Sequence, residues 1–374
     1  MDNISWVEDG ADRLTGWHSE SGAPAPTKVV VANDALTADT AMRMVRSGTA
    51  ILWRGDYHNA RQLLKALDRR VQRRTAKRER GEVTFASHRV VRTERATLLG
   101  RLLVELEDDH SLDLRRAPDV REACTAAYGE PSGKVIALTE LLGVIGAHQW
   151  QAKGVHVPGL GESVHPGYGV FSPVRGEYVD LVVNAPLGDT PPRTAFDLGT
   201  GTGVLAVVLA RRGIGHVVAT DINPRAVASA ADNIARLGVS ERVTALEADL
   251  FPEGRADLVV CNPPWLPGEP TSALEAGIYD PGSDMLRRFL SGLAEHLEPG
   301  GEGWLVLSDL AERLGLRTRE ELLGWIVDAG LRVTDRLETV PRHGRADDAK
   351  DALHEARRGE VTSLWRLAVI SSVG

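Results

Sequence analysis

The 374-residue sequence predicts an α/β protein with a parallel sheet in its second half and an α+β domain before it. Two observations predict this class. From about residue 190 onward, short β-branched runs alternate with segments of helical apolar spacing, which is typical of βα units. The charge also divides the chain: residues 1–163 hold 23 basic and 22 acidic side chains, whereas residues 164–374 hold 21 and 30.

The boundary between the two domains is expected near residue 150. Five glycines and two prolines lie between residues 154 and 169, a composition typical of a linker. We therefore expect a first domain at 1–150 and a second domain at 151–374 that begins with a glycine-rich linker at 151–169. The length of the first domain is sufficient for a separate surface that recognises a macromolecular or bulky substrate.

The composition excludes several classes of protein. Apolar residues make up 43% and charged residues 26% of the chain, which excludes largely disordered and collagen-like proteins. The two cysteines, Cys124 and Cys261, form no CxxC pair, so we expect neither a disulfide framework nor a metal site. No run of 18 apolar residues occurs and the start is acidic, unlike a secretory signal, so we expect a cytoplasmic protein without membrane contact.

The second half is expected to alternate strands and helices. Asn223 followed by Pro224 marks one helix start, and Thr318 with Glu321 forms a capping box that marks another. Two long β-branched runs near the end predict an antiparallel hairpin, with the charged stretch 341–360 between them as a lid or a solvated connector. The expected strands are 194–198, 216–220, 243–247, 256–261, 302–308 and the hairpin strands 331–340 and 361–370.

The first half predicts two helices and a hairpin. Residues 98–106 and 110–115 are expected to form the hairpin, and residues 118–128 a helix that ends at Gly129. Residues 57–80 are expected to form the other helix, because one helical stripe is apolar: Leu63, Leu64, Leu67 and Val71.

The helix expected at 57–80 is strongly basic. It holds nine Lys and Arg side chains against two acidic ones, a net charge of +7 in a chain whose formal net charge is −8. Such a surface is able to contact the phosphates of RNA. A solvated face, or a face docked on the acidic second half of the chain, explains the same residues. Both interpretations stay open at this point.

A glycine-rich segment follows the strand expected at 194–198. Asp197 is followed by Leu198-Gly199-Thr200-Gly201-Thr202-Gly203 and then by an apolar helix. Glycines let the backbone turn tightly and approach a ligand, and a helix N-terminus offers free N–H groups. Because a carboxylate here would repel a pyrophosphate but attract an ammonium group, the segment favours a nucleotide with an amino-acid moiety.

Acidic residues also follow the next two expected strands. Asp221 is placed to accept from two ribose hydroxyls, as an acid does in doubly wound sheets, and Asp249 is placed to accept from an adenine amino group. The candidate cofactor-binding residues are Asp197, Gly199, Thr200, Gly201, Gly203, Asp221, Ile222, Asp249, Leu250 and Asn262.

These residues resemble motif I and the acidic positions after it in class I S-adenosylmethionine-dependent methyltransferases. The resemblance implies S-adenosylmethionine as cofactor, with Asp197 and the glycines at its methionine part, Asp221 at its ribose and Asp249 at its adenine. It also implies a Rossmann-like sheet of seven strands in the order 3-2-1-4-5-7-6, with an antiparallel last strand. The hairpin expected near the end of the chain agrees with that order.

The strand expected at 256–261 is followed by Asn262-Pro263-Pro264-Trp265, which we take as the catalytic residues. A planar amide or exocyclic amine is a poor nucleophile, because its nitrogen lone pair is delocalised. The Asn262 side-chain oxygen and the Pro263 carbonyl can each accept one N–H, which holds the nitrogen as the methyl arrives. The prolines fix the direction of that carbonyl, and Trp265 can stack on the planar group.

This tetrapeptide resembles the (N/D/S)PP(Y/F/W) motif of methyltransferases that act on glutamine amides or on base amines. The stretch 170–178 and the loop 265–290 are similar to segments of HemK-type glutamine methyltransferases, so the favoured acceptor is a glutamine side chain of a protein. Three departures concern the substrate: Trp265 replaces the usual Tyr, Ser172-Pro173-Val174-Arg175 replaces a Pro-Arg-Pro run, and the N-terminal part is longer.

Two other functions stay open on the sequence alone. An exocyclic amine of an RNA or DNA base is the alternative acceptor, favoured by the basic helix and the long first domain. A non-catalytic nucleotide-binding module is the alternative of another class, and the intact Asn262-Pro263-Pro264-Trp265 motif argues against it.

Overall fold

The structure is a computed structural model that describes residues 2–78, 84–188, 190–341 and 353–370. It divides into two compact units, Met1–Gln149 and Trp150–Gly374. The division lies one residue from the boundary that the sequence predicts. None of the helices in the described part of the chain is long and apolar enough to cross a membrane.

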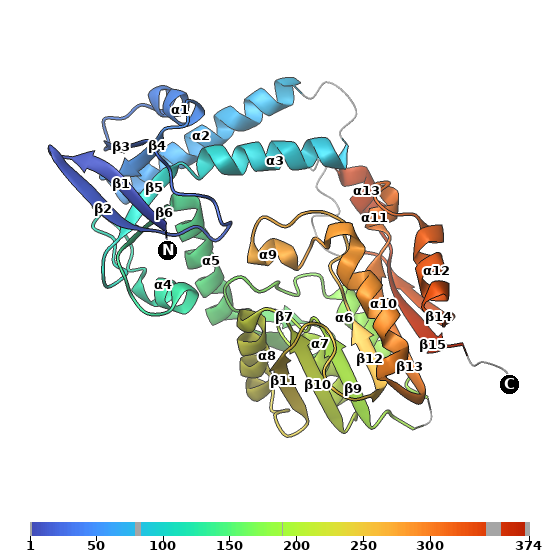
Figure 1. Ribbon diagram of the computed structural model, residues 1–374. Coiled ribbons are helices and arrows are strands. Elements are labelled where there is room, and N and C mark those ends of the chain that lie inside the picture. Colours follow the sequence, from blue (N-terminus) through green and yellow to red (C-terminus); the bar gives the residue numbers. More distant parts are fainter. Residues whose placement is uncertain (1, 79–83, 189, 342–352, 371–374) are drawn as a thin grey trace. The chain divides into compact units, whose positions relative to one another are not determined.

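The first unit contains a six-stranded mixed sheet (Figure 1). Its elements are β1 (Asp2–Glu8), β2 (Ala11–Trp17), β3 (Val29–Ala32), α1 (Ala38–Arg46), β4 (Ala50–Trp53), α2 (Tyr57–Arg78), α3 (Phe85–Leu99), β5 (Leu102–Leu106), α4 (Arg121–Tyr128), β6 (Lys134–Ala137) and α5 (Leu138–Lys153), which continues past the division. The strand order is β1-β2-β6-β5-β4-β3, with β3, β4 and β5 parallel and β6 antiparallel to β5.

Both helices that the sequence predicts in this unit are confirmed. Helix α2 buries the predicted apolar stripe, and α4 ends at Gly129, whose φ of +77° lies in the left-handed region that favours glycine. The hairpin predicted at 98–106 and 110–115 is wrong. Residues 98–99 end α3, residues 110–115 form no strand, and β5 pairs instead with the distant strands β4 and β6.

The second unit contains a seven-stranded sheet in the order β11-β10-β9-β12-β13-β15-β14 (Figure 1). Strands β11, β10, β9, β12 and β13 run parallel, and β15 is antiparallel to both of its neighbours. The elements that make up this sheet are β9 (Thr194–Leu198), β10 (His216–Asp221), β11 (Val243–Glu247), β12 (Ala256–Cys261), β13 (Leu297–Ser308), β14 (Leu331–Thr339) and β15 (Thr362–Val369). The predicted strands and the terminal hairpin are therefore confirmed.

Helices cover both faces of this sheet, which gives three layers. Buried side chains of α6, α7 and α8 share one apolar core with the sheet, and those of α10 and α12 share the other. Asn223 and the Thr318–Glu321 capping box begin α8 and α12, as the sequence predicts. The helices are α6 (Glu177–Asn184), α7 (Val204–Arg211), α8 (Pro224–Arg236), α9 (Ala273–Ala276), η1 (Pro281–Ser283), α10 (Asp284–His296), α11 (Leu310–Arg313), α12 (Arg319–Asp328) and α13 (His354–Arg358).

The glycine-rich linker predicted at 151–169 is wrong. This segment contains the end of α5 and an antiparallel hairpin, β7 (Val155–Val157) with β8 (Glu162–Val164), and its valines belong to the core of the second unit. Its glycines serve turns: Gly154 and Gly161 have φ of +75° and +68° on either side of β7. The stretch predicted as a lid or connector, 341–360, lies mostly outside the described residues, which resume at 353 with α13 close behind.

Candidate active site

The loops after β9, β10 and β12 meet at one edge of the second sheet. Leu198 of β9 pairs with Thr220 of β10 on one side and with Cys261 of β12 on the other. Strands are about 4.8 Å apart, so residues that follow paired positions are near neighbours. The residues directly after these three are the candidate site residues Gly199, Asp221 and Asn262.

The loop after β9 requires glycine at three positions. Gly199, Gly201 and Gly203 have φ of +69°, +55° and +79°. A Cβ on Gly203 would lie 3.2 Å from Cα of Ala230 in α8, whereas a Cβ on Gly201 would have no heavy atom within 4 Å. The loop therefore packs on a helix at its end and borders open space at its centre, where a ligand can approach the backbone.

Asp197 is buried and organises this loop. Its Oδ2 accepts from Thr200 Oγ1 at 2.6 Å and from the backbone N–H of Ala206 at 3.0 Å. Burial raises the pKa of Asp197 to about 6, although both hydrogen bonds favour the ionised form. The carboxylate is therefore ionised at neutral pH and becomes protonated in mild acid.

Asp221 connects the loops after β9 and β10. Its Oδ2 accepts from the backbone N–H of Gly201 at 3.0 Å and its Oδ1 accepts from that of Asn223 at 2.9 Å. Burial raises its pKa above the usual range for Asp. The next side chain, Ile222, is 68% exposed, which gives the edge an uncovered apolar surface beside this carboxylate.

Asp249 lies on a more open part of the same edge. It forms an ion pair with Arg288 of α10 at 2.8 Å, and both side chains are about half exposed. Leu250, by contrast, is buried with a φ of +77°, and its carbonyl accepts from Thr220 Oγ1 at 2.6 Å. This hydrogen bond holds the loop after β11 against the end of β10.

The motif after β12 has an internal hydrogen bond that the sequence does not predict. The indole Nε1–H of Trp265 donates to Oδ1 of Asn262 at 2.8 Å. Trp265 is half-buried and packs against both apolar cores of the second unit, while Pro263 is buried. The side-chain oxygen that the sequence assigns to the acceptor nitrogen is therefore already held by one donor.

The family model for the methyltransferase small domain matches residues 164–315. The release factor glutamine methyltransferase of Cereibacter sphaeroides is 36% identical over 182 residues, which cover 45% of this chain and 60% of the relative. The one of Gloeobacter violaceus is 32% identical over 225 residues, which cover 56% of this chain and 72% of the relative.

The chain belongs to the release factor glutamine methyltransferase family. A putative protein N5-glutamine methyltransferase of Methanocaldococcus jannaschii is also similar, with 28% identity over 187 residues that cover 48% of this chain and 91% of the relative. The matched part of the chain thus spans between about three fifths and nine tenths of these relatives.

The residues at this edge fit S-adenosylmethionine, the cofactor of the methyltransferase family. The open space at Gly201 admits a ligand close to the backbone, the carboxylates of Asp197 and Asp221 attract a cation, and exposed Ile222 offers an apolar face to a base. Carboxylates that accept hydrogen bonds suit an organic cation that carries ribose hydroxyls. No group of three or more metal-ligating side chains occurs among the described residues.

Sequence patterns missed two features of this candidate site. Met285 of α10 lies over the glycine loop, because a Cβ on Gly199 would come within 2.7 Å of its Cε. Arg175 lies near the ring of Trp265 and bonds to the buried Glu360. These three contacts join residues that are more than 80 positions apart, and the one available signal was the unusual Arg175 before α6.

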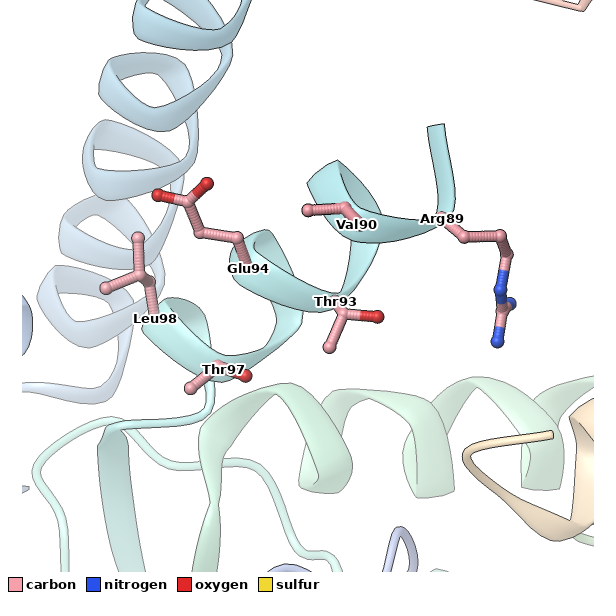
Figure 2. Close-up of a pocket in the computed structure, with 6 residues that line it drawn as sticks. All are labelled: Arg89, Val90, Thr93, Glu94, Thr97 and Leu98. Carbon is pink, nitrogen blue, oxygen red and sulfur yellow. The ribbon is translucent and has the colours of Figure 1, made fainter. Parts of the chain in front are cut away.

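A pocket elsewhere in the chain holds none of the predicted residues. It has a volume of about 460 Å³ and lies along a single helix, α3 of the first unit (Figure 2). Its lining residues are Arg89, Val90, Thr93, Glu94, Thr97 and Leu98. With walls from one helix it is a surface groove, and none of the candidate site residues lines it.

Proposed function

We propose that this chain transfers a methyl group from S-adenosylmethionine to the side-chain amide nitrogen of a glutamine in a protein. The observation that carries the proposal is the register of β9 with β10 and β12, which brings the glycine loop, Asp221 and Asn262 to one edge. The observed strand order, 3-2-1-4-5-7-6 within the second unit, supports assignment to the class I methyltransferase fold.

Each candidate cofactor-binding residue has a role at the cofactor in this proposal, except Asn262, which holds the acceptor. Asp197 attracts the methionine ammonium across the loop of Gly199, Thr200, Gly201 and Gly203. Asp221 accepts from the ribose hydroxyls, since each carboxylate oxygen can accept more than one hydrogen bond. Ile222 and Leu250 border the adenine, and Asp249 accepts from its amino group while it stays paired with Arg288.

Asn262 and Pro263 hold the acceptor amide. The Asn262 Oδ1 and the Pro263 carbonyl each accept one N–H of the glutamine, which turns the nitrogen lone pair toward the donor and opposes its delocalisation. S-adenosylmethionine supplies an electrophilic methyl group when bound. The amide nitrogen forms a bond to that methyl as the bond to sulfur breaks, and the nitrogen then loses one proton to water.

A labelling experiment tests the acceptor class. The protein is incubated with a cell extract and S-adenosylmethionine labelled in the methyl group, and the product is divided between protease and nuclease digestion. We expect label in macromolecules that protease, not nuclease, converts to small fragments. Label that only nuclease releases would contradict a protein acceptor and favour a base amine.

Cofactor affinity is expected to depend on pH through Asp197. The pKa of Asp197 in the folded chain, about 6, lies above the usual value for Asp. Without cofactor, the protonated side chain therefore stabilises the folded protein at low pH, and this stabilisation is lost as pH rises through 6. The cofactor ammonium favours the ionised form, so affinity should rise with pH up to about 6.5 and fall up to tenfold per unit below 6.

Calorimetry of cofactor binding between pH 5 and 8 measures this dependence. Asp197→Asn keeps an oxygen for the N–H of Ala206 but does not titrate, so its affinity should be weaker at pH 7.5 and nearly constant with pH. An equally steep pH dependence in this variant would assign the titration to another group, such as Asp221.

A second candidate partner is a nucleic acid, bound by α2 of the first unit. Lys65, Arg69 and Arg73 are exposed, and no ion pair joins them to any residue that the structure describes. With Arg61 they form a ridge of like charges at spacing four, away from the buried stripe. Like charges four residues apart destabilise a helix, and bound phosphates would reduce the repulsion between these side chains.

Charge reversal tests this partner independently of methyl transfer. Arg69→Glu with Arg73→Glu should weaken binding of single-stranded RNA. The slope of log affinity against log salt concentration should also fall, by the amount expected for the loss of about two phosphate contacts. Reversal of two exposed arginines of the second unit, Arg236 and Arg332, is the matched control. Equal losses in both double variants would indicate non-specific attraction and contradict a binding surface on α2.

A further inference from the structure

A buried ion pair lies next to the catalytic motif. Arg175, in the loop before α6, donates through one terminal nitrogen to Oε1 of Glu360 at 2.8 Å. Ser308, the last residue of β13, donates its hydroxyl to the same oxygen at 2.6 Å. Glu360 is 1% exposed, and it precedes β15 by two residues. The pair therefore joins the loop before α6 to the carboxyl end of β13.

This pair is connected to Asn262 through Trp265. The guanidinium carbon of Arg175 lies 5.6 Å from the centre of the Trp265 ring, within the range of a cation–π contact. The Nε1–H of the same ring donates to Asn262 Oδ1 at 2.8 Å. An unbroken series of contacts thus runs from Ser308 and Glu360 to the side chain that is proposed to hold the acceptor.

Stability alone does not explain the pair. Buried ion pairs can often be replaced by apolar residues without loss of stability, because the charges lose hydration when they are buried. Here the loss is incompletely compensated: Glu360 Oε2 is buried and has no hydrogen-bond partner among the described residues. A purely structural contact at this place would be better made by apolar side chains.

The chemistry of Asn262 gives the pair a function. The two ends of an Asn amide have similar shapes, but one end accepts hydrogen bonds and the other donates them. An indole N–H can only donate, so it pairs with Oδ1 and opposes the flipped amide. In the flipped orientation the NH₂ group would meet both the indole N–H and the N–H of the acceptor, and neither hydrogen bond would form.

We propose that Trp265, Arg175 and Glu360 are positioning residues that fix the orientation of the Asn262 amide. Trp265 holds Oδ1 and leaves its second lone pair for the acceptor N–H, and the Arg175–Glu360 pair holds the indole ring in place. This inference rests on the proposed function and adds to it. The residue at the fourth position of the motif is then a part of the acceptor site through its N–H, not only a ring that stacks.

A double-mutant cycle tests the role of Trp265. Trp265→Phe keeps an aromatic ring but removes the donor, and kcat should fall about tenfold with an unchanged Kd for S-adenosylmethionine. In the Asn262→Asp background both ends of the side chain accept, so the same substitution should lower kcat by less than about twofold. Equal losses in the two backgrounds would assign a merely structural role to Trp265 and contradict the inference.

A double variant tests Arg175 and Glu360. This test does not require that the Asn262→Asp variant is active. Arg175→Met with Glu360→Leu should keep the Tm within a few degrees of the wild type but lower kcat about fivefold or more. The matched control is Glu302→Gln, which breaks a similar contact with Arg366 nearer the other end of β13 and should leave kcat unchanged.

The outcomes separate this inference from the proposed function. A wild-type protein that methylates glutamine, together with full kcat in both Trp265→Phe and the Arg175 and Glu360 double variant, would overturn the inference alone. A wild-type protein that methylates no glutamine would overturn the proposed function, and with it the assignment of these residues to an acceptor site.

Discussion

Asn262→Ala is expected to lower kcat for methyl transfer by at least about 10²-fold, while the affinity for S-adenosylmethionine changes by less than about threefold. The substitution removes the side-chain oxygen that we assign to the acceptor N–H and leaves the glycine loop and Asp221 unchanged. Loss of one preorganised hydrogen-bonding group at a reacting centre has a cost of this size in other enzymes. Single-turnover kinetics and calorimetry measure the two quantities on the same protein.

Asn262→Asp is the informative companion to this variant. Its carboxylate keeps an acceptor for the indole N–H of Trp265 and another for the glutamine, so it should retain more activity than the alanine variant. Alanine and aspartate variants that both transfer methyl groups at the wild-type rate would contradict the assignment of Asn262. A loss of cofactor affinity equal to the loss of kcat would instead place this residue in the cofactor site.

Asp221→Ala is expected to weaken binding of S-adenosylmethionine by at least about 10²-fold. Two hydrogen bonds from the ribose to a charged carboxylate would be lost, each worth about 1.5–3 kcal/mol. The hydrogen bond from the N–H of Gly201 would be lost as well, which loosens the loop that borders the methionine part. Calorimetry measures the affinity, and thermal unfolding in the absence of cofactor measures the change in stability.

Asp257→Ala is a matched control for this prediction. Asp257 also accepts two backbone N–H groups, from Arg193 and Thr194, but it lies near the amino end of β12, away from the site. It should lower stability without any change in affinity. If both variants bind the cofactor with wild-type affinity, the assignment of Asp221 to the ribose is wrong.

Local sequence patterns predicted most of the second unit. The strands of its sheet have β-branched runs. Two of its helices begin at N-cap residues whose side chains accept a hydrogen bond from a backbone N–H two or three residues later. The glycine loop was also predictable from local sequence. Its three glycines have positive φ values, which glycine adopts more readily than any other residue. Gly199 and Asn262 directly follow β9 and β12. Asp197 and Asp221 lie within the last two residues of β9 and β10, and Asp249 lies two residues after β11, so these site residues were predictable from the strands.

Contacts between distant residues account for what the sequence missed. Residues 151–169 have the composition of a linker, yet Val155, Val157 and Val164 belong to a core whose other members come from the whole second unit. The hairpin expected around β5 failed because β5 pairs with strands outside that segment. The bond from Trp265 to Asn262 is local, but the amide orientation it sets has no signal in residue types alone.

Mass spectrometry of labelled peptides tests the central claim most directly. The protein is incubated with a cell extract and S-adenosylmethionine that carries a trideuterated methyl group, and proteolytic peptides are sequenced by fragmentation. We predict the trideuteromethyl group on the side-chain amide nitrogen of a glutamine, present with the wild-type protein and absent with Asn262→Ala. Label found only on other side chains or on nucleosides, or equal glutamine labelling by the variant, would contradict this account.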